Sequence, residues 1–215
     1  MVFVVALLAV LLASASALAQ GDEPDDALRR PDGLTAGVAD QLLGQLAPDE
    51  RTLYFVSTRH TTHELWVEDV DQGRSRLLFD EDADVTWPRV SPDGKSIAYI
   101  SFRDRADGQL CVRDLPDAGG RRCLDDPLPA LSVEWIDASR AVVLVRASID
   151  GGLGLREVAV RGSLRSKPLL ERDLSTPAIS PDGHWLAYVP IERYSPQVGL
   201  AFAPRAGKNI GIVAL

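Results

Sequence analysis

Two histidines and a nearby run of carboxylates are the side chains best suited to binding a metal ion. His60 and His63 lie three residues apart, but the sequence holds only one other histidine, His184, and a structural zinc ion takes four protein ligands. The acidic run Asp80–Asp84 lacks the glycine and the regular ligand spacing of a calcium-binding loop. We therefore expect both segments to be solvated loops, with no metal and no cofactor.

A serine nucleophile of the hydrolase type would stand at a sharp strand-to-helix turn with the pattern Gly-x-Ser-x-Gly. The nearest match is Gly94-Lys95-Ser96-Ile97-Ala98, which lacks the final glycine and begins an apolar run typical of a β-strand. Because structural context decides such matches, we expect Ser96 to be structural. No residue of the chain is predicted to be catalytic.

Two cysteines, Cys111 and Cys123, could form a disulfide. The midpoint between them falls in the predicted turn Pro116–Gly120, so they stand opposite each other in an antiparallel hairpin. Opposed Cβ atoms in such a pair are about 4.5 to 5.5 Å apart, which is close to what a disulfide accepts. We predict a cross-strand disulfide. The alternative is a pair of small apolar residues that pack within the sheet.

A four-residue turn motif occurs twice and reveals an internal repeat. Serine, proline, aspartate and glycine suit the successive positions of a tight turn that joins two strands. The two copies are Ser91-Pro92-Asp93-Gly94 and Ser180-Pro181-Asp182-Gly183. Aspartates in the same register, each followed by an apolar run, occur at Asp49 and Asp137, which gives a period of 44 to 45 residues.

Each repeat contains the pattern of four short β-strands. After the apolar run, segments 64–70 and 109–115 alternate apolar and polar residues, as half-buried strands do. Turn residues and a fourth strand follow, at 74–79 and 121–124. Four antiparallel strands in about 44 residues are typical of a β-propeller blade. We therefore predict an all-β propeller of about four blades, with units starting near residues 45, 89, 133 and 177.

The repeat also resembles a known family. Segments Pro88–Tyr99 and Pro177–Tyr188 are similar to the WD40-like repeat called PD40, which builds the propeller of the TolB family and is related to the propellers of the prolyl oligopeptidase family. The resemblance covers residues 42–215. It implies a ring of six or more blades, of which this chain supplies a part. The α/β domain that precedes the TolB propeller has no counterpart here, so residues 20–41 are predicted to be a linker.

The first 19 residues have the features of a secretory signal peptide. They carry no charge, and an apolar run is followed by small residues that end in Ala17-Leu18-Ala19. We predict cleavage after Ala19 and a periplasmic or secreted protein, with no membrane span in the mature chain. An uncleaved membrane anchor is the alternative. A lipid anchor is not expected, because no cysteine follows the apolar run.

Charge and aromatic content restrict the partners. The formal net charge is −8 and basic residues are scattered, so neither nucleic acid nor an anionic lipid surface is expected as a partner. The tryptophans are expected to pack between blades, since periodic apolar positions usually mark a core. They are Trp66, Trp87, Trp135 and Trp185.

These features predict a non-enzymatic exported propeller that binds a protein or a cell-envelope component. Two alternatives remain. The chain could be the propeller portion of a longer exported serine peptidase whose catalytic domain lies beyond Leu215, or a lectin-like propeller that binds glycans. A fold alone does not decide among functions of these classes.

Overall fold

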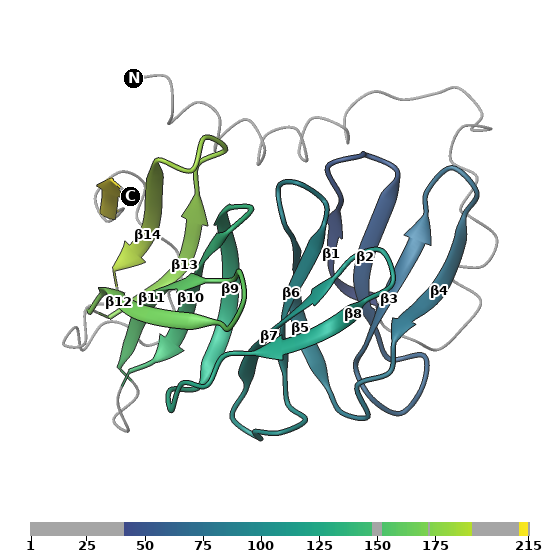
Figure 1. Ribbon diagram of the computed structural model, residues 1–215, viewed down its shortest axis with the longest axis horizontal. Helices are drawn as coiled ribbons and strands as arrows, with labels where there is room; N and C mark the ends of the chain where they lie inside the picture. Colours follow the sequence, from purple (N-terminus) through teal and green to yellow (C-terminus); the bar gives the residue numbers. More distant parts are fainter. Residues whose placement is uncertain (1–40, 148–151, 172, 191–210, 215) are drawn as a thin grey trace, which may run out of the picture. The chain divides into compact units, whose positions relative to one another are not determined.

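The computed structural model describes residues 41–147, 152–171, 173–190 and 211–214, and within these ranges it contains β-strands and no helix. The strands form successive antiparallel sheets, which are the blades of a β-propeller (Figure 1). The all-β propeller prediction is thus confirmed. The predicted signal peptide, residues 1–19, and nearly all of the predicted linker lie outside the described residues.

Each blade is a meander in which neighbouring strands are consecutive in the sequence. Blade 1 contains β1 (Gln41–Leu46), β2 (Thr52–Ser57), β3 (Glu64–Asp69) and β4 (Arg74–Phe79), and blade 2 contains β5 (Val85–Val90), β6 (Ser96–Ser101), β7 (Gln109–Asp114) and β8 (Gly119–Cys123). Blade 3 contains β9 (Ala130–Asp137), β10 (Arg140–Arg146), β11 (Leu153–Ala159) and β12 (Arg165–Leu170). The described part of blade 4 contains β13 (Leu174–Ile179), β14 (Trp185–Pro190) and β15 (Gly211–Ala214), with β15 paired to β14.

The repeated aspartates fix the turn between the first two strands of every blade. In each turn the carboxylate accepts a hydrogen bond from the backbone N–H two residues further on, at 2.7 to 3.2 Å. Hydrogen bonds from the Arg51 N–H at Asp49, and from serine hydroxyls at Asp93 and Asp182, lower the pKa of these three carboxyl groups. The aspartates that repeat every 44 to 45 residues in the sequence therefore mark the same turn in each of the four blades.

The first strands of the blades lie side by side and form the inner rim of the blade array. β1 contacts β5, β5 contacts β9, and β9 contacts β13, whereas the fourth strands make no comparable contacts with other blades among the described residues. The strands β1, β5, β9 and β13 are therefore called the inner strands.

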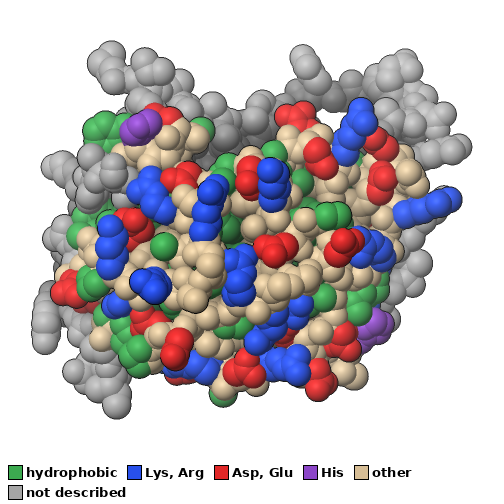
Figure 2. Space-filling view, in the orientation of Figure 1, with side chains coloured by type: hydrophobic (Ala, Val, Ile, Leu, Met, Phe, Trp, Pro, Cys, Tyr) green, Lys and Arg blue, Asp and Glu red, His purple; other side chains and the backbone are tan. Residues whose placement is uncertain are grey.

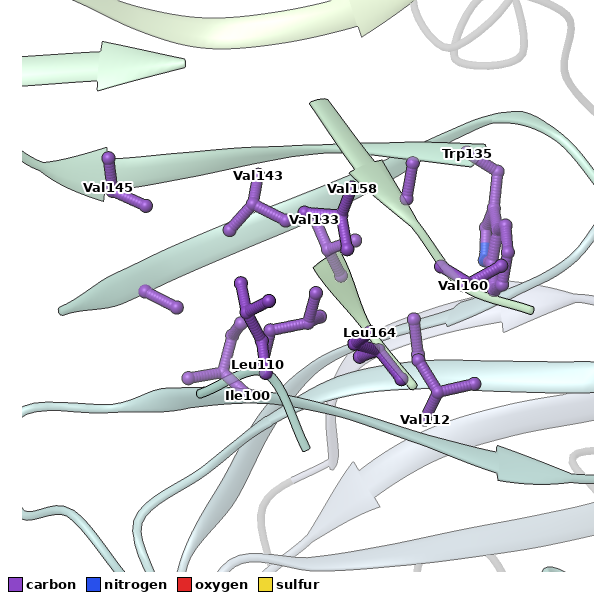
Figure 3. Packing of buried hydrophobic residues seen from close by; sticks show 14 residues of the cluster. Ile100, Leu110, Val112, Val133, Trp135, Val143, Val145, Val158, Val160 and Leu164 are labelled. Atoms are coloured by element: carbon purple, nitrogen blue, oxygen red, sulfur yellow. The ribbon is translucent and has the colours of Figure 1, made fainter. Parts of the chain in front are cut away.

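The hydrophobic core lies between adjacent blades. Three apolar clusters fill the spaces between blades 1 and 2, 2 and 3, and 3 and 4. In the second space, Ile100 and Leu110 of blade 2 meet Val133 and Val143 of blade 3 (Figure 3). Because successive side chains of a strand point to opposite faces, every central blade buries both of its faces. This explains the nearly continuous burial of strands such as β6 and β10.

A buried carboxylate ties blade 2 to the loop that enters it. Glu81 is 3% exposed and accepts hydrogen bonds from Arg121 Nε at 2.7 Å, Arg113 Nη2 at 3.0 Å and Ser101 Oγ at 2.9 Å. Burial opposes its charge, but these partners outweigh burial and lower the pKa of Glu81. The expectation of a solvated acidic loop at Asp80–Asp84 is wrong for Glu81, because two guanidinium groups compensate its charge inside the interface.

No helix in the described part of the chain is long and apolar enough to cross a membrane.

Candidate binding surface on the inner strands

The inner strands share a bulge at the same point of the repeat. In β1 two residues, Leu43 and Gly44, stand opposite a single residue of β2, and in β5 Trp87 and Pro88 do the same against β6. The register of β13 shifts in the same way at residues 176–177. β9 has a related shift at Leu131. Bulges re-aim side chains and are common next to binding sites, so the inner rim carries a repeated irregularity.

Two of these bulges hold a large apolar residue in an unfavourable backbone conformation. Leu43 and Trp87 both have φ of 52°, in the left-handed region that is costly for residues other than glycine, asparagine and aspartate. Leu43 is 38% exposed, and Trp87 is partly buried against the core between blades 2 and 3. Strain of this kind persists where the surrounding structure enforces it, and it is frequent at ligand sites.

A partly exposed ion pair lies beside Trp87 and joins two inner strands. Arg89 Nε contacts both carboxylate oxygens of Glu134, at 3.0 and 3.1 Å, and the side chains are 21% and 23% exposed. Trp87 Nε1 donates to the same carboxylate at 3.4 Å, and the Arg89 guanidinium lies 5.2 Å from the Trp87 ring centroid. Burial raises the pKa of Glu134 and outweighs the opposite effect of Arg89.

Further hydrogen bonds fix the inner strands to one another. Trp135 Nε1 donates to the Arg89 carbonyl at 2.9 Å, and the Val90 N–H donates to Gln45 Oε1 at 2.7 Å. The rim therefore offers apolar side chains, an aromatic ring and both charge signs on a rigid support. This is a set of groups suited to binding a polypeptide, with no nucleophile and base in contact among the described side chains of the rim.

The residues singled out from the sequence lie elsewhere. Ser91, Asp93, Ser180 and Asp182 form turns between the first two strands of blades 2 and 4, where each serine hydroxyl donates to the aspartate two residues later. Ser96 is the first residue of β6 and closes its turn through a backbone hydrogen bond to Ser91. None of these residues belongs to the inner-strand bulges.

The two cysteines stand opposite each other across β7 and β8, which is the placement that the predicted disulfide requires. Cys111 is fully buried in the core between blades 1 and 2. The pair therefore lies at an interface between blades and away from the inner rim.

Each histidine of the first loop contacts a carboxylate. His60 Nδ1 lies 2.6 Å from Glu64 Oε2, and His63 Nδ1 lies 3.0 Å from Asp84 Oδ1. The His63 N–H also donates to Asp84 Oδ1 at 2.8 Å, which fixes the loop before β3 to the residue before β5. The two imidazoles therefore contact different carboxylates, His60 that of Glu64 and His63 that of Asp84.

The tryptophans do not share one role. Trp135 is buried between blades 2 and 3, as expected, and Trp87 occupies the bulge of β5. Trp185 is 46% exposed, so the expectation of packing between blades is wrong for it. The reason is strand alternation, because Leu186 and Tyr188 take the face of β14 that packs against blade 3.

Surface charge gives no stronger candidate site. On the side of the molecule seen in Figure 2, acidic and basic side chains are interspersed. A site that depends on a field of one sign is therefore not evident on this side, and the inner strands remain the best-defined candidate surface.

Comparisons with known proteins place the fold and leave the activity open. No family model matches the chain. A sequence relative is the uncharacterized peptidase YuxL of Bacillus subtilis (strain 168), which is 24% identical over 187 residues, covering 67% of this chain and 28% of YuxL. The chain thus spans less than a third of this relative's length.

Solved structures with the same fold include TolB from Acinetobacter baumannii, with a TM-score of 0.57 and 16% identity over 81% of this chain and 40% of TolB. A prolyl endopeptidase matches with a TM-score of 0.54 and 18% identity, over 70% of this chain and 26% of the endopeptidase. The described blades therefore have the fold of TolB-like and peptidase-associated propellers.

The expectation that the protein is not an enzyme is contradicted by these comparisons. A sequence relative is named a peptidase, and propellers of the same fold occur in a prolyl endopeptidase and in puromycin hydrolase. The chain covers only 26 to 28% of each of these three proteins. The lack of a catalytic motif in the sequence was therefore too weak a reason to exclude an enzyme.

Proposed function

We propose that this chain is an exported β-propeller that recognises polypeptide at its bulged inner strands. The observation that carries the proposal is Trp87, which is held at a φ of 52° in the bulge of β5, beside the Arg89–Glu134 pair. An aromatic ring and paired charges on a rigid strand suit a polypeptide with both apolar and polar side chains.

Export is part of the proposal and is supported by the predicted signal peptide at residues 1–19. A disulfide between Cys111 and Cys123 would suit an oxidising compartment. The bound polypeptide is then a protein of the same compartment or a protein component of the cell envelope.

A second candidate function is admission of substrate to a serine peptidase. The observation that favours it is the match to YuxL over 67% of this chain. In this case the inner strands would recognise the polypeptide that the enzyme cleaves. Both candidates assign the same chemistry to the rim, and they differ in what happens to the bound chain.

Site-specific photo-crosslinking in the producing cell tests the proposal. The crosslinking residue p-benzoylphenylalanine replaces Leu43 on the inner rim or, as a control, Arg165 on the outer strand β12. We expect polypeptide adducts at position 43. The yield of these adducts should fall about ten-fold when Trp87→Ala is introduced, because truncation of an aromatic hot spot weakens binding by about this amount. Adducts of equal yield at both positions, or adducts indifferent to Trp87→Ala, would contradict polypeptide binding at the rim.

The second candidate is separated from the first by kinetics. The wild-type protein and the Trp87→Ala variant are each purified from the native host, and their hydrolysis of peptidyl p-nitroanilides is measured. Hydrolysis whose KM rises in the variant while kcat stays constant supports substrate admission. Crosslinking without hydrolysis supports a binding propeller.

A further inference from the structure

One position of the repeat carries a different side chain on each inner strand. Its pairing partner is always the fifth residue after the turn aspartate, which assigns the position to Gln45, Arg89, Glu134 and Ala178. In blades 1 and 2 this side chain reaches the next inner strand, since Gln45 accepts from the Val90 N–H and Arg89 contacts Glu134. The first three side chains therefore form a polar row along the rim.

Arg89 is the one basic residue of the four inner strands, and part of its donor capacity is unused. A guanidinium group carries five N–H donors. Nε donates to Glu134, and Nη1 donates to the Pro88 carbonyl at 2.9 Å. Nη2 has no hydrogen-bond partner among the described residues, yet it is not one of the buried atoms that lack a partner. This nitrogen therefore reaches the surface of the rim.

Glu134, by contrast, has little acceptor capacity left. Both of its oxygens accept from Arg89 Nε, and one of them also accepts from Trp87 Nε1. Arginine often binds a carboxylate through two parallel N–H bonds, whereas here a single N–H serves both oxygens. The charge of Arg89 is thus balanced while its hydrogen bonds are not saturated, so the open groups of this pair are mainly donors.

We propose that Arg89 binds a carboxylate group of the polypeptide recognised at the rim, and that Trp87 packs against the apolar atoms beside that group. A carboxylate is the acceptor that suits a guanidinium best, because its hydrogen bonds are charge-assisted. Glu134 holds Arg89 in place and competes with the ligand for it. This inference rests on the proposed function, since it specifies which polypeptides the rim selects.

Binding to synthetic peptides tests the assignment. The full-length chain, labelled with a fluorescent dye, is applied to an array of hexapeptides whose central position is Glu or Gln and whose other positions are randomised among uncharged residues. Each set is made with a C-terminal carboxylate and with a C-terminal amide. We expect peptides that carry a carboxylate to bind about ten-fold more tightly than neutral ones.

Two matched variants locate the carboxylate. The preference for acidic peptides should disappear in Arg89→Gln. It should persist in Arg140→Gln, the control, because Arg140 belongs to β10 and pairs with Asp137. A preference that follows the central Glu indicates an acidic side chain as the ligand, and one that follows the free terminus indicates the end of the chain. Either result supports the proposal.

The contrary outcomes separate this inference from the function on which it rests. Equal binding of acidic and neutral peptides, still weakened by Trp87→Ala, would overturn the carboxylate site and leave polypeptide recognition intact. A preference for acidic peptides that survives Arg89→Gln would place the carboxylate elsewhere and would overturn the assignment as well. If the wild-type chain bound no peptide at all, both the inference and the proposed function would fall.

Glu134→Gln adds a gain of binding, which a misfolded variant could not produce. Glutamine keeps the shape of the side chain and removes its charge, so Arg89 loses its competitor. Binding of acidic peptides should rise about three-fold or more, whereas binding of neutral peptides should stay constant. Unchanged or weaker binding of the acidic peptides would contradict the competition between Glu134 and the ligand, and with it the assignment of Arg89.

Discussion

At the scale of single residues, the aspartate of each turn links the sequence repeat to acid stability. Burial opposes the charge of Asp137, but hydrogen bonds from the Ser139 hydroxyl and N–H and from Arg140 outweigh burial and lower its pKa to about 2. A carboxyl group with a lowered pKa stabilises the fold above its unfolded pKa near 3.8, and this contribution is lost as the pH falls toward 2.

Replacement of Asp137 by asparagine should therefore flatten the acid dependence of stability. The side chain is 41% exposed, so solvent screening reduces the contribution to about 1 kcal/mol. We expect the Tm difference between wild type and Asp137→Asn to be largest above pH 4 and to shrink as the pH falls to 2. A difference that grows toward acid pH would contradict the assigned ionisation.

The disulfide between Cys111 and Cys123 remains a prediction of the sequence that thiol counting can test. Titration under denaturing, non-reducing conditions should find no free thiol. Replacement of both cysteines by serine should cost about 2 to 3 kcal/mol of unfolding free energy, the amount expected for a short loop, because the sequence separation is 12. Two titratable thiols, or a wild-type stability indifferent to reducing agent, would contradict the bond.

At the scale of strands and turns, two glycines with positive φ differ in what surrounds them. Gly108 has φ of 92°, and a Cβ placed there would lie 2.5 Å from the Ala130 carbonyl oxygen of the next blade. Gly94 has φ of 71° and open space around it. Gly94→Ala should cost about 1 kcal/mol for backbone conformation alone.

Gly108→Ala should cost considerably more, because the clash is with backbone and cannot be relieved by a rotamer change. Urea denaturation of the two variants gives the comparison directly. Equal losses would mean that the blade interface yields at little cost, which would argue against the close approach of β7 and β9.

The elements were predictable to the extent that they depend on local sequence. The third strands and the fourth strand of blade 1 match the predicted segments closely, because alternation and turn residues are local signals. The bulges at Leu43 and Trp87 were missed, since no local pattern marks an apolar residue at positive φ. The Arg89–Glu134 pair was missed because its members are 45 residues apart. A search for opposite charges one repeat apart would have found it.

Burial of Glu81 shows the limit of composition as a signal. A run of carboxylates in a sequence indicates a solvated loop. Glu81 is nevertheless buried between blades 1 and 2, because Arg113 of β7 and Arg121 of β8 compensate its charge there. A carboxylate recurs four residues before β9, at Asp126, which is also buried, so the repeat itself carries a signal for a buried carboxylate at this point.

At the scale of the whole molecule, the blades are coupled mainly to their immediate neighbours. Apolar clusters join blade 1 to 2, 2 to 3 and 3 to 4, and the Arg89–Glu134 ion pair also joins blades 2 and 3. In such an array, stability is close to a sum of units and nearest-neighbour interfaces. Damage to one interface should therefore remain local.

Glu81→Gln tests this expectation. We predict a loss of about 3 kcal/mol, typical of a broken buried ion pair, and faster amide hydrogen exchange in blades 1 and 2. Exchange in β11 and β14 should change little. A uniform increase across all blades would instead indicate one cooperative unit.

The dependence of each blade on its neighbour also bears on how the protein responds to mechanical load. Contacts such as Arg89–Glu134 and Trp135–Arg89 join residues 45 and 46 positions apart, so a pulling force that detaches one blade releases a segment of nearly constant length. At about 3.4 Å per extended residue, each release would lengthen the chain by about 15 nm. Under tension the propeller would then give way in equal steps, one repeat at a time.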